Sequence, residues 1–317
     1  MGFTNSWHSV QRFGEPGWVE ILPRVIVVTG ADSKYFPLLC DCIQSLRAFP
    51  ELAEIEIGVI DLGLDAAHHE WLKGQSVSVV PLGWDVDLSN YPGVPTYFKA
   101  MTARPHLPRH FPNHDIIMWL DADIWVQDRA FVKIYLDAAG ADGFAVTPEI
   151  DRAYSILYGG QNTLRLFHHN VYAQCFGRLV ADRLIDFPIL NSGAFAIHRS
   201  HPIWEEWRKA LLRTINTVVL LHSEQAALNY AAYLSPGLPR PHMLPATANW
   251  VCAQALPKWD PQRKKLVEPN FPHASLGLIH LTGIKSEQRI PMIGGGEVLT
   301  ALTRTAMQNL ANNGRVS

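Results

Sequence analysis

The hydrophobic positions of this chain form short apolar runs that alternate with amphipathic segments. Four runs rich in β-branched residues are typical of buried strands, and they cover residues 24–29, 55–60, 77–81 and 115–120. Three segments with apolar residues at helical spacing separate them, at residues 35–49, 68–74 and 96–107. This alternation predicts an α/β fold with a mainly parallel central sheet flanked by helices on both faces.

The second half of the chain continues the alternation. Helices are predicted at residues 129–139, 202–215 and 223–233, and strands at 143–147, 190–198 and 276–280. Residues 151–187 form a polar, aromatic stretch with a predicted helix at 171–183, and we expect it to lie over the sheet rather than to join it. The triple glycine at 294–296 is expected to be a hinge before a C-terminal helix at 298–311.

Polar residues follow the predicted strands where these end, and ligands of parallel sheets bind at that edge. Asp121 and Asp123 close the apolar run 115–120. Alternate residues of extended chain point the same way, with Cα atoms roughly 7 Å apart. Two convergent carboxylates repel each other unless a divalent cation lies between them. The pair therefore predicts a metal site, and the alternative is a solvated turn.

Composition narrows the function classes. The chain has 317 residues, of which 48% are hydrophobic, enough for a large core. Its 27 basic residues are dispersed and the net charge is −2, so we expect no nucleic-acid partner. The four cysteines show neither metal spacing nor a disulfide framework. The sequence has neither the glycine-rich loop of dinucleotide-binding dehydrogenases nor that of ATPases, which argues against both classes of enzyme. It also shows no apolar leader and no apolar run of membrane-spanning length, so a cytoplasmic protein is expected.

Five segments, in this order along the chain, resemble the GT-A-fold glycosyltransferases and, among them, glycosyltransferase family 8, which includes glycogenin and bacterial lipopolysaccharide galactosyltransferases. The segments are Val28-Thr29-Gly30-Ala31-Asp32 with Tyr35, Asp121-Ala122-Asp123, Asn191-Ser192-Gly193-Ala194-Phe195, Glu224-Gln225-Ala226-Ala227-Leu228-Asn229 and His280-Leu281-Thr282-Gly283-Ile284-Lys285. Two departures stand out: Glu224 replaces an aspartate, and Lys285 follows Gly283 by two residues instead of three.

The resemblance implies a single Rossmann-like, nucleotide-diphospho-sugar transferase domain over residues 20–317. A nucleotide-sugar-binding half would cover about 20–128, an acceptor and catalytic half about 129–297, and a C-terminal helix 298–317. The resemblance also implies that Asp121, Asp123 and His280 hold the metal and that Asn191, Glu224 and Gln225 act on the sugar. Its implied nucleotide-sugar contacts are Thr29, Ala31, Asp32, Ala122, Ser192, Gly193, Gly283 and Lys285.

Position in the sequence adds two nucleotide-sugar contacts. Asp61 follows the second predicted strand, and Lys99 lies on the helix before the metal strand, where it can reach a phosphate. Each has an alternative: Asp32 and Asp61 can instead cap the following helices, and Lys99 can be an exposed helical lysine. His280 has the alternative of a core histidine.

These observations predict a metal-dependent glycosyltransferase of the hexosyltransferase type. The donor is expected to be a nucleotide sugar, specifically a UDP-sugar. The acceptor is expected to be a carbohydrate, a lipid-linked glycan or another hydroxyl compound. Mn²⁺ is favoured over Mg²⁺ because an imidazole lies among the ligands. The resemblance implies retention at the anomeric carbon. The segments 151–187 and 236–248 are expected to shape the acceptor site, and the loop 283–296 to be a lid.

Other functions stay open at this point. One alternative is a sugar nucleotidyltransferase, and another is a non-catalytic nucleotide-sugar-binding protein. If the reaction instead inverted the configuration at the anomeric carbon, Glu224 would be the base that takes the proton of the acceptor hydroxyl. The C-terminal helix is expected to pack on the core, with peripheral membrane contact or a second subunit as alternatives. The sequence does not predict an oligomeric state.

Overall fold

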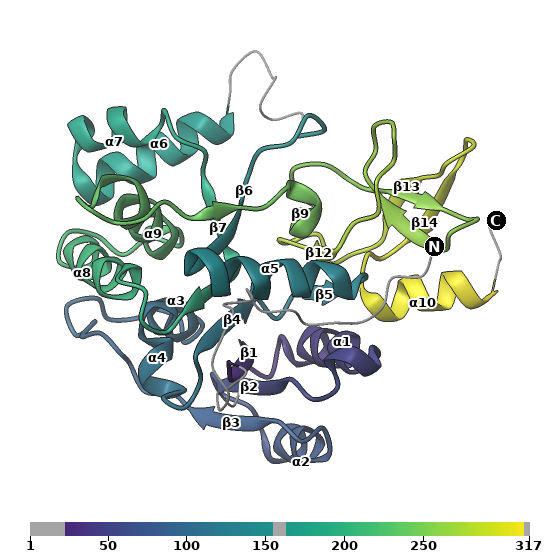
Figure 1. The fold of residues 1–317 in the computed structure, drawn as a ribbon, viewed down its shortest axis with the longest axis horizontal. Helices are drawn as coiled ribbons and strands as arrows, with labels where there is room; N and C mark the ends of the chain where they lie inside the picture. Colours follow the sequence, from purple (N-terminus) through teal and green to yellow (C-terminus); the bar gives the residue numbers. More distant parts are fainter. Residues whose placement is uncertain (1–22, 155–162, 314–317) are drawn as a thin grey trace, which may run out of the picture.

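The computed structural model describes residues 23–154 and 163–313, which are arranged around a seven-stranded sheet (Figure 1). The strand order is β3-β2-β1-β4-β7-β6-β8. The strands are β1 (Val25–Ala31), β2 (Glu56–Asp61), β3 (Ser78–Pro81), β4 (Ile116–Leu120), β6 (Phe144–Pro148), β7 (Leu190–His198) and β8 (His242–Met243). Neighbouring strands are parallel except where β7 pairs with β4 and β6. The predicted α/β fold with a mainly parallel sheet is confirmed.

Helices cover both faces of this sheet (Figure 1). One face packs against α1 (Phe36–Arg47), α2 (Ala66–Gly74) and α5 (Arg129–Asp142). The other packs against α3 (Phe98–Ala103), α4 (Leu107–His110), α6 (Thr163–Phe176), α7 (Arg178–Leu184), α8 (Ile203–Ile215) and α9 (Ser223–Leu234). Strand β4 is buried along its whole length because both of its faces are covered, which is why its sequence is an uninterrupted apolar run.

A second, smaller sheet lies beside the first and has the order β5-β12-β9. It consists of β5 (Ile124–Val126), β12 (Leu278–His280) and β9 (Trp250–Val251). Around it lie two hairpins, β10–β11 (Lys258–Asp260 and Lys265–Val267) and β13–β14 (Gln288–Pro291 and Glu297–Thr300), and the helix α10 (Arg304–Asn313). Strand β12 brings His280 from the far end of the sequence to the edge that follows β4.

The structure corrects three boundaries. The helix predicted at 96–107 is broken into α3, a 3-10 turn (Arg104–His106) and α4, because prolines stand at the start of the second and third pieces. The helix predicted at 171–183 is part of two helices that are separated at Gly177, whose φ is 86°. The proline-rich loop 236–248 contains β8, which extends the main sheet beside β6.

The C-terminal prediction was wrong in detail. Residues 298–300 belong to β14, and the triple glycine forms the turn of the β13–β14 hairpin, with φ values of 91°, 105° and 80°. Only glycine adopts such angles readily, so the turn and not a hinge explains the three glycines. The helix α10 begins at Arg304 and packs on the core through Met307, which is 3% exposed, as the favoured interpretation predicted.

The domain limits at residues 20 and 317 lie outside the described residues, and the division into two functional halves stays a prediction. Within 23–154 and 163–313, no helix combines the length and the apolar character required to cross a lipid bilayer.

Gly277 directly precedes β12, and a substitution there tests how tightly this strand packs against α5. Its N–H donates to the Thr247 carbonyl oxygen over 2.8 Å, and an added Cβ would lie 2.0 Å from Phe131 Cγ. We expect Gly277→Ala to lower the free energy of unfolding by about 1–3 kcal/mol, because α5 must move away to admit the methyl group. Urea unfolding followed by circular dichroism measures the change.

Gly74→Ala is the matched control, since a Cβ there meets no atom within 4 Å. Its stability is expected to be unchanged or slightly higher, as alanine restricts the unfolded chain. Equal unfolding curves for the two variants would contradict the packing of Phe131 over Gly277.

Candidate functional site

Asp121, Asp123 and His280 lie together at the carboxyl end of β4. One ligand atom from each of the three lies within 4.8 Å of the others. His280 Nε2 is 3.8 Å from Asp121 Oδ2 and 3.5 Å from Asp123 Oδ1. The sequence placed these residues on one site, and the structure brings them together from the turn after β4 and from β12.

The electrostatics of this cluster fit a divalent cation. Burial lowers the pKa of His280, but Asp123 and Asp121 outweigh it and raise the pKa above its ordinary value. Burial raises the pKa of Asp123, but His280 and Lys285 outweigh it and lower that pKa. The site therefore concentrates negative charge that a positive group must balance. Two carboxylates and one imidazole are a ligand set that Mn²⁺ accepts.

Strand β7 runs antiparallel beside β4 and holds Asp121 in place. The Asp121 N–H donates to the Gly193 carbonyl oxygen over 2.8 Å, and Trp119 Nε1 donates to Asp121 Oδ1 over 2.7 Å. A Cβ on Gly193 would lie 2.4 Å from His280 Cε1 and 2.9 Å from Asp121 Oδ2. Glycine is thus the residue that lets β7 pass this close to the cluster.

The sequence did not predict Arg104, which connects the cluster to Ser192 and Glu224. It lies on the 3-10 turn between α3 and α4 and is almost fully buried. Its guanidinium donates to Asp121 Oδ1 and to Glu224 Oε2, and over 3.2 Å to Ser192 Oγ. No local pattern around Arg104 indicates this role, because its partners come 17, 88 and 120 residues later.

Glu224 and Gln225 begin α9 and face Ser192 on β7. Ser192 Oγ donates to Glu224 Oε2 over 3.0 Å, and its N–H donates to Gln225 Oε1 over 3.1 Å. Burial raises the pKa of Glu224 to about 7, although Arg104 and Ser192 act in the opposite direction. The structure therefore joins two of the matched segments through direct hydrogen bonds.

Glu149, another residue that the sequence did not predict, follows β6 and is buried. Its carboxylate accepts from Asn191 Nδ2 over 2.8 Å, from Gln225 Nε2 over 3.2 Å and from Gln254 Nε2 over 3.2 Å. Asn191 Oδ1 in turn accepts from the Gly193 N–H over 3.0 Å. Glu149 thus fixes the amides of the predicted catalytic residues Asn191 and Gln225.

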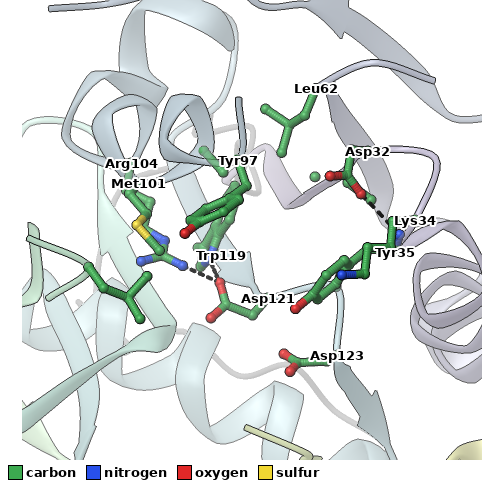
Figure 2. Close-up of a pocket in the computed structure, with 15 residues that line it drawn as sticks. Asp32, Lys34, Tyr35, Leu62, Tyr97, Met101, Arg104, Trp119, Asp121 and Asp123 are labelled. Atoms are coloured by element: carbon green, nitrogen blue, oxygen red, sulfur yellow. Dashed lines mark hydrogen bonds and ion pairs between the residues drawn. The ribbon is translucent and has the colours of Figure 1, made fainter. Parts of the chain in front are cut away.

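Two cavities meet at the metal cluster. The first, of about 390 Å³, lies between the end of β1 and α3 and is shown in Figure 2. The second, of about 540 Å³, extends over β7 and the start of α9. Both are lined by Asp121, Asp123, Arg104 and Tyr35. Predicted residues lining the first cavity are Ala31, Asp32 and Ala122, and those lining the second are Asn191, Ser192, Gly193, Glu224, Gln225, His280, Gly283 and Lys285.

Three predicted contacts are not brought to these cavities. Thr29 is fully buried inside β1. Asp61 shapes the turn after β2, where its Oδ1 accepts from the Gly63 and Leu64 N–H groups over 2.8 and 2.7 Å. Lys99 Nζ donates to the Leu82 carbonyl oxygen over 3.1 Å, away from the cluster.

Asp32 combines both of its proposed roles. Its Oδ1 accepts from the Tyr35 N–H over 3.0 Å, just before α1, and the residue also lines the first cavity, as Figure 2 shows.

No family model and no curated protein matches the chain. Among solved structures, the chain is similar to the galactosyltransferase LgtC in complex with donor and acceptor sugar analogs, with 19% identity, a TM-score of 0.41, and coverage of 64% of this chain and 69% of that one. It is also similar to the bifunctional glycosyltransferase WbbM, with 15% identity, a TM-score of 0.48, and coverage of 72% of this chain and 40% of that one. A third similar structure is GlyE of Streptococcus pneumoniae, with 14% identity, a TM-score of 0.46, and coverage of 82% of this chain and 54% of that one. These similar structures are glycosyltransferases. The chain spans about half the length of WbbM and GlyE or less.

Arg104 provides a stability test of the site's architecture. We expect Arg104→Met to lower the free energy of unfolding by about 3–5 kcal/mol in metal-free buffer, because it leaves the buried Glu224 carboxylate and the partly buried Asp121 carboxylate without their cation. Combining it with Glu224→Gln, which removes one of those charges, is expected to recover part of the loss. Urea unfolding of the single and double variants measures this coupling.

Arg109→Met, on exposed α4 surface close by, is the control and is expected to change stability by no more than about 0.5 kcal/mol. Strictly additive effects of Arg104→Met and Glu224→Gln would show that the two side chains do not depend on each other.

Proposed function

We propose that this chain is a metal-dependent glycosyltransferase that takes a nucleotide-sugar donor, with UDP as the nucleotide. The observation that carries the proposal is the position of Asp121, Asp123 and His280 where two cavities meet. One cavity is lined by strand-end residues suited to a nucleotide, and the other by polar side chains suited to a sugar. A divalent cation held at their junction is what the diphosphate between these two parts requires.

The nucleotide side is formed by the ends of β1 and β2. Ala31, Asp32, Tyr35 and Leu62 line the first cavity, so that apolar surface and one carboxylate are available to a base and a ribose. Lys285 Nζ lies 3.6 Å from the centre of the Tyr35 ring and lines the second cavity. Its positive charge is available to the diphosphate, which supports the UDP-sugar donor over an uncharged ligand.

The sugar side is formed by β7 and α9. Glu224 Oε1 is buried and has no hydrogen-bond partner among the described residues. A buried acceptor without a partner is unfavourable by about 1–3 kcal/mol, and a sugar hydroxyl would satisfy it. This supports Glu224 as a donor-sugar contact, beside Ser192 and Gln225.

We propose that Asp121, Asp123 and His280 hold Mn²⁺ or Mg²⁺. A metal bound there would neutralise the negative charge that develops on the departing nucleoside diphosphate. Lys285 adds a second positive charge on the same side. We propose that the loop directly after β12, which carries Gly283 and Lys285, is the part that covers the donor; the rest of the predicted lid 283–296 belongs to β13 and its hairpin turn.

The carboxylates of the site support retention at the anomeric carbon. An inverting enzyme needs a carboxylate base on the acceptor hydroxyl. Glu224 Oε2 accepts hydrogen bonds from Arg104 and Ser192, and the Glu149 carboxylate accepts three amide hydrogen bonds, so each of these groups is already engaged within the protein. Gln225 has no basic group to offer. A cytoplasmic location for the reaction stays a prediction.

The donor reaction provides the test. UDP-sugar hydrolysis by the wild type is expected to require Mn²⁺, and Asp123→Asn is expected to reduce UDP release at least about 100-fold, because it removes a charged metal ligand. Calorimetric titration with UDP, with and without Mn²⁺, measures binding alongside turnover.

Asp137→Asn, an exposed carboxylate on α5, is the control and is expected to keep wild-type values. Failure of every sugar nucleotide to bind, with or without metal, would refute the transferase proposal. Pyrophosphate release from UTP and a sugar phosphate would instead identify a nucleotidyltransferase.

A further inference from the structure

The second cavity has an aromatic wall that the metal and donor assignments do not use. It consists of Phe167 and His168 on α6 and His222 directly before α9, and all three line the cavity. None of them belongs to a matched sequence segment. They belong to the same cavity as Glu224, Gln225 and the metal cluster, so a molecule against the aromatic wall lies in the same space as the reacting sugar.

The three rings fix one another through edge-to-face contacts. The Phe167 and His222 centroids are 5.0 Å apart at 87°, those of Phe167 and His168 are 5.3 Å apart at 86°, and those of His168 and His222 are 6.0 Å apart at 66°. Phe167 nevertheless stays 44% exposed, whereas His168 is only 3% exposed. An aromatic side chain that is held rigidly and is open to a polar cavity presents an apolar surface on which a flat ligand face can stack.

The charges around the aromatic wall exclude an anionic ligand. Burial lowers the pKa of His168 to about 4 and lowers that of His222 as well, so both imidazoles are neutral at neutral pH. Arg104 and Lys285 carry the positive charges among the described lysine and arginine side chains that line this cavity. Arg104 is paired with Glu224 and Asp121. Lys285 lies over the ring of Tyr35. The carboxylate of Glu149 adds a negative charge to the same cavity.

We propose that the aromatic wall is the acceptor subsite and that it selects the terminal residue of an uncharged glycoside. A pyranose has an apolar face that stacks on Phe167, while its hydroxyl groups meet neutral imidazoles that can both donate and accept hydrogen bonds. The inference rests on the proposed function and gives it the acceptor class that the donor geometry does not specify.

The reaction that this assignment describes is balanced. The oxygen of one acceptor hydroxyl forms a bond to the anomeric carbon of the donor sugar as the bond from that carbon to the nucleoside diphosphate breaks. The hydroxyl proton passes to the departing diphosphate. The products are the extended glycoside and the nucleoside diphosphate, and no oxidant or other co-reactant takes part.

Direct binding tests the aromatic wall independently of turnover. Saturation-transfer NMR with methyl β-galactoside and methyl β-glucoside, in the presence of UDP and Mn²⁺, is expected to show binding to the wild type, and methyl β-glucuronide is expected to bind more weakly. Phe167→Ala should weaken binding of the neutral glycosides about tenfold or more, because stacking surface is lost. Phe167→Trp should keep binding, since it keeps an aromatic face.

Leu166→Ala is the matched control: Leu166 is the neighbouring residue on α6, is 56% exposed and does not line the cavity. Its glycoside binding should equal that of the wild type, and thermal unfolding should be similar for Leu166→Ala and Phe167→Ala. Wild-type binding that survives Phe167→Ala, stronger binding of the glucuronide, or no glycoside binding at all would overturn the proposal.

The donor assay separates this result from a failure of the proposed function. Phe167→Ala should raise the KM for the glycoside acceptor about tenfold and lower transfer to the glycoside by a larger factor than it lowers Mn²⁺-dependent UDP-sugar hydrolysis. Absence of hydrolysis in the wild type would refute the transferase proposal, and the NMR titration would still decide whether the aromatic wall binds neutral glycosides. A fall in hydrolysis equal to the fall in transfer would refute the acceptor role.

Discussion

The site depends on the balance of charge at the end of β4. Asp121, Asp123 and Glu224 face a small region between the sheet and its helices, where Arg104 pairs with Asp121 and Glu224 and His280 lies beside both aspartates. Buried carboxylates without partners would destabilise the fold by several kcal/mol. The Arg104 guanidinium solves this by bridging Asp121 and Glu224, which fixes the metal cluster and the sugar-side residues relative to each other.

Strand β7 makes this bridge geometrically accessible. Because it runs antiparallel to β4, Ser192 and Gly193 lie next to Asp121, and the absence of a side chain on Gly193 leaves room for His280. The same strand presents Asn191 to Glu149. A parallel strand at this position would need a long crossover and would bring a different set of residues to the edge. The one reversed strand in the main sheet is therefore the element that joins its two halves at the site.

The sequence predicted the sheet, most helices and the grouping of Asp121 with Asp123 because these leave local signals. β-branched runs mark the strands, and Asp121 with Asp123 directly follows one of them. Errors fell where a local signal had two interpretations. The triple glycine is a hairpin turn instead of a hinge, and a strand-end carboxylate such as Asp61 organises its own turn instead of facing the cavity.

Arg104 and Glu149 show what local signals cannot provide. Each acts through partners dozens of residues away in the sequence, so an isolated arginine after a helix and an isolated glutamate after a strand look like surface residues until the chain is folded. Lys99 shows the converse, because its position before the metal strand suggested a phosphate contact, yet its Nζ reaches the Leu82 carbonyl oxygen.

The distribution of charge around the two cavities is consistent with the two ligands that we propose. In the proposed function, a cation held by Asp121, Asp123 and His280 would attract a diphosphate together with Lys285. The acceptor side offers neutral imidazoles, amides and one phenyl ring, which discriminate by shape and by hydrogen bonding at short range. A diphosphate placed against Glu149 would meet repulsion, and a neutral sugar gains little at the metal cluster. If both proposals hold, charge separates the two ligands before the reacting atoms come into contact.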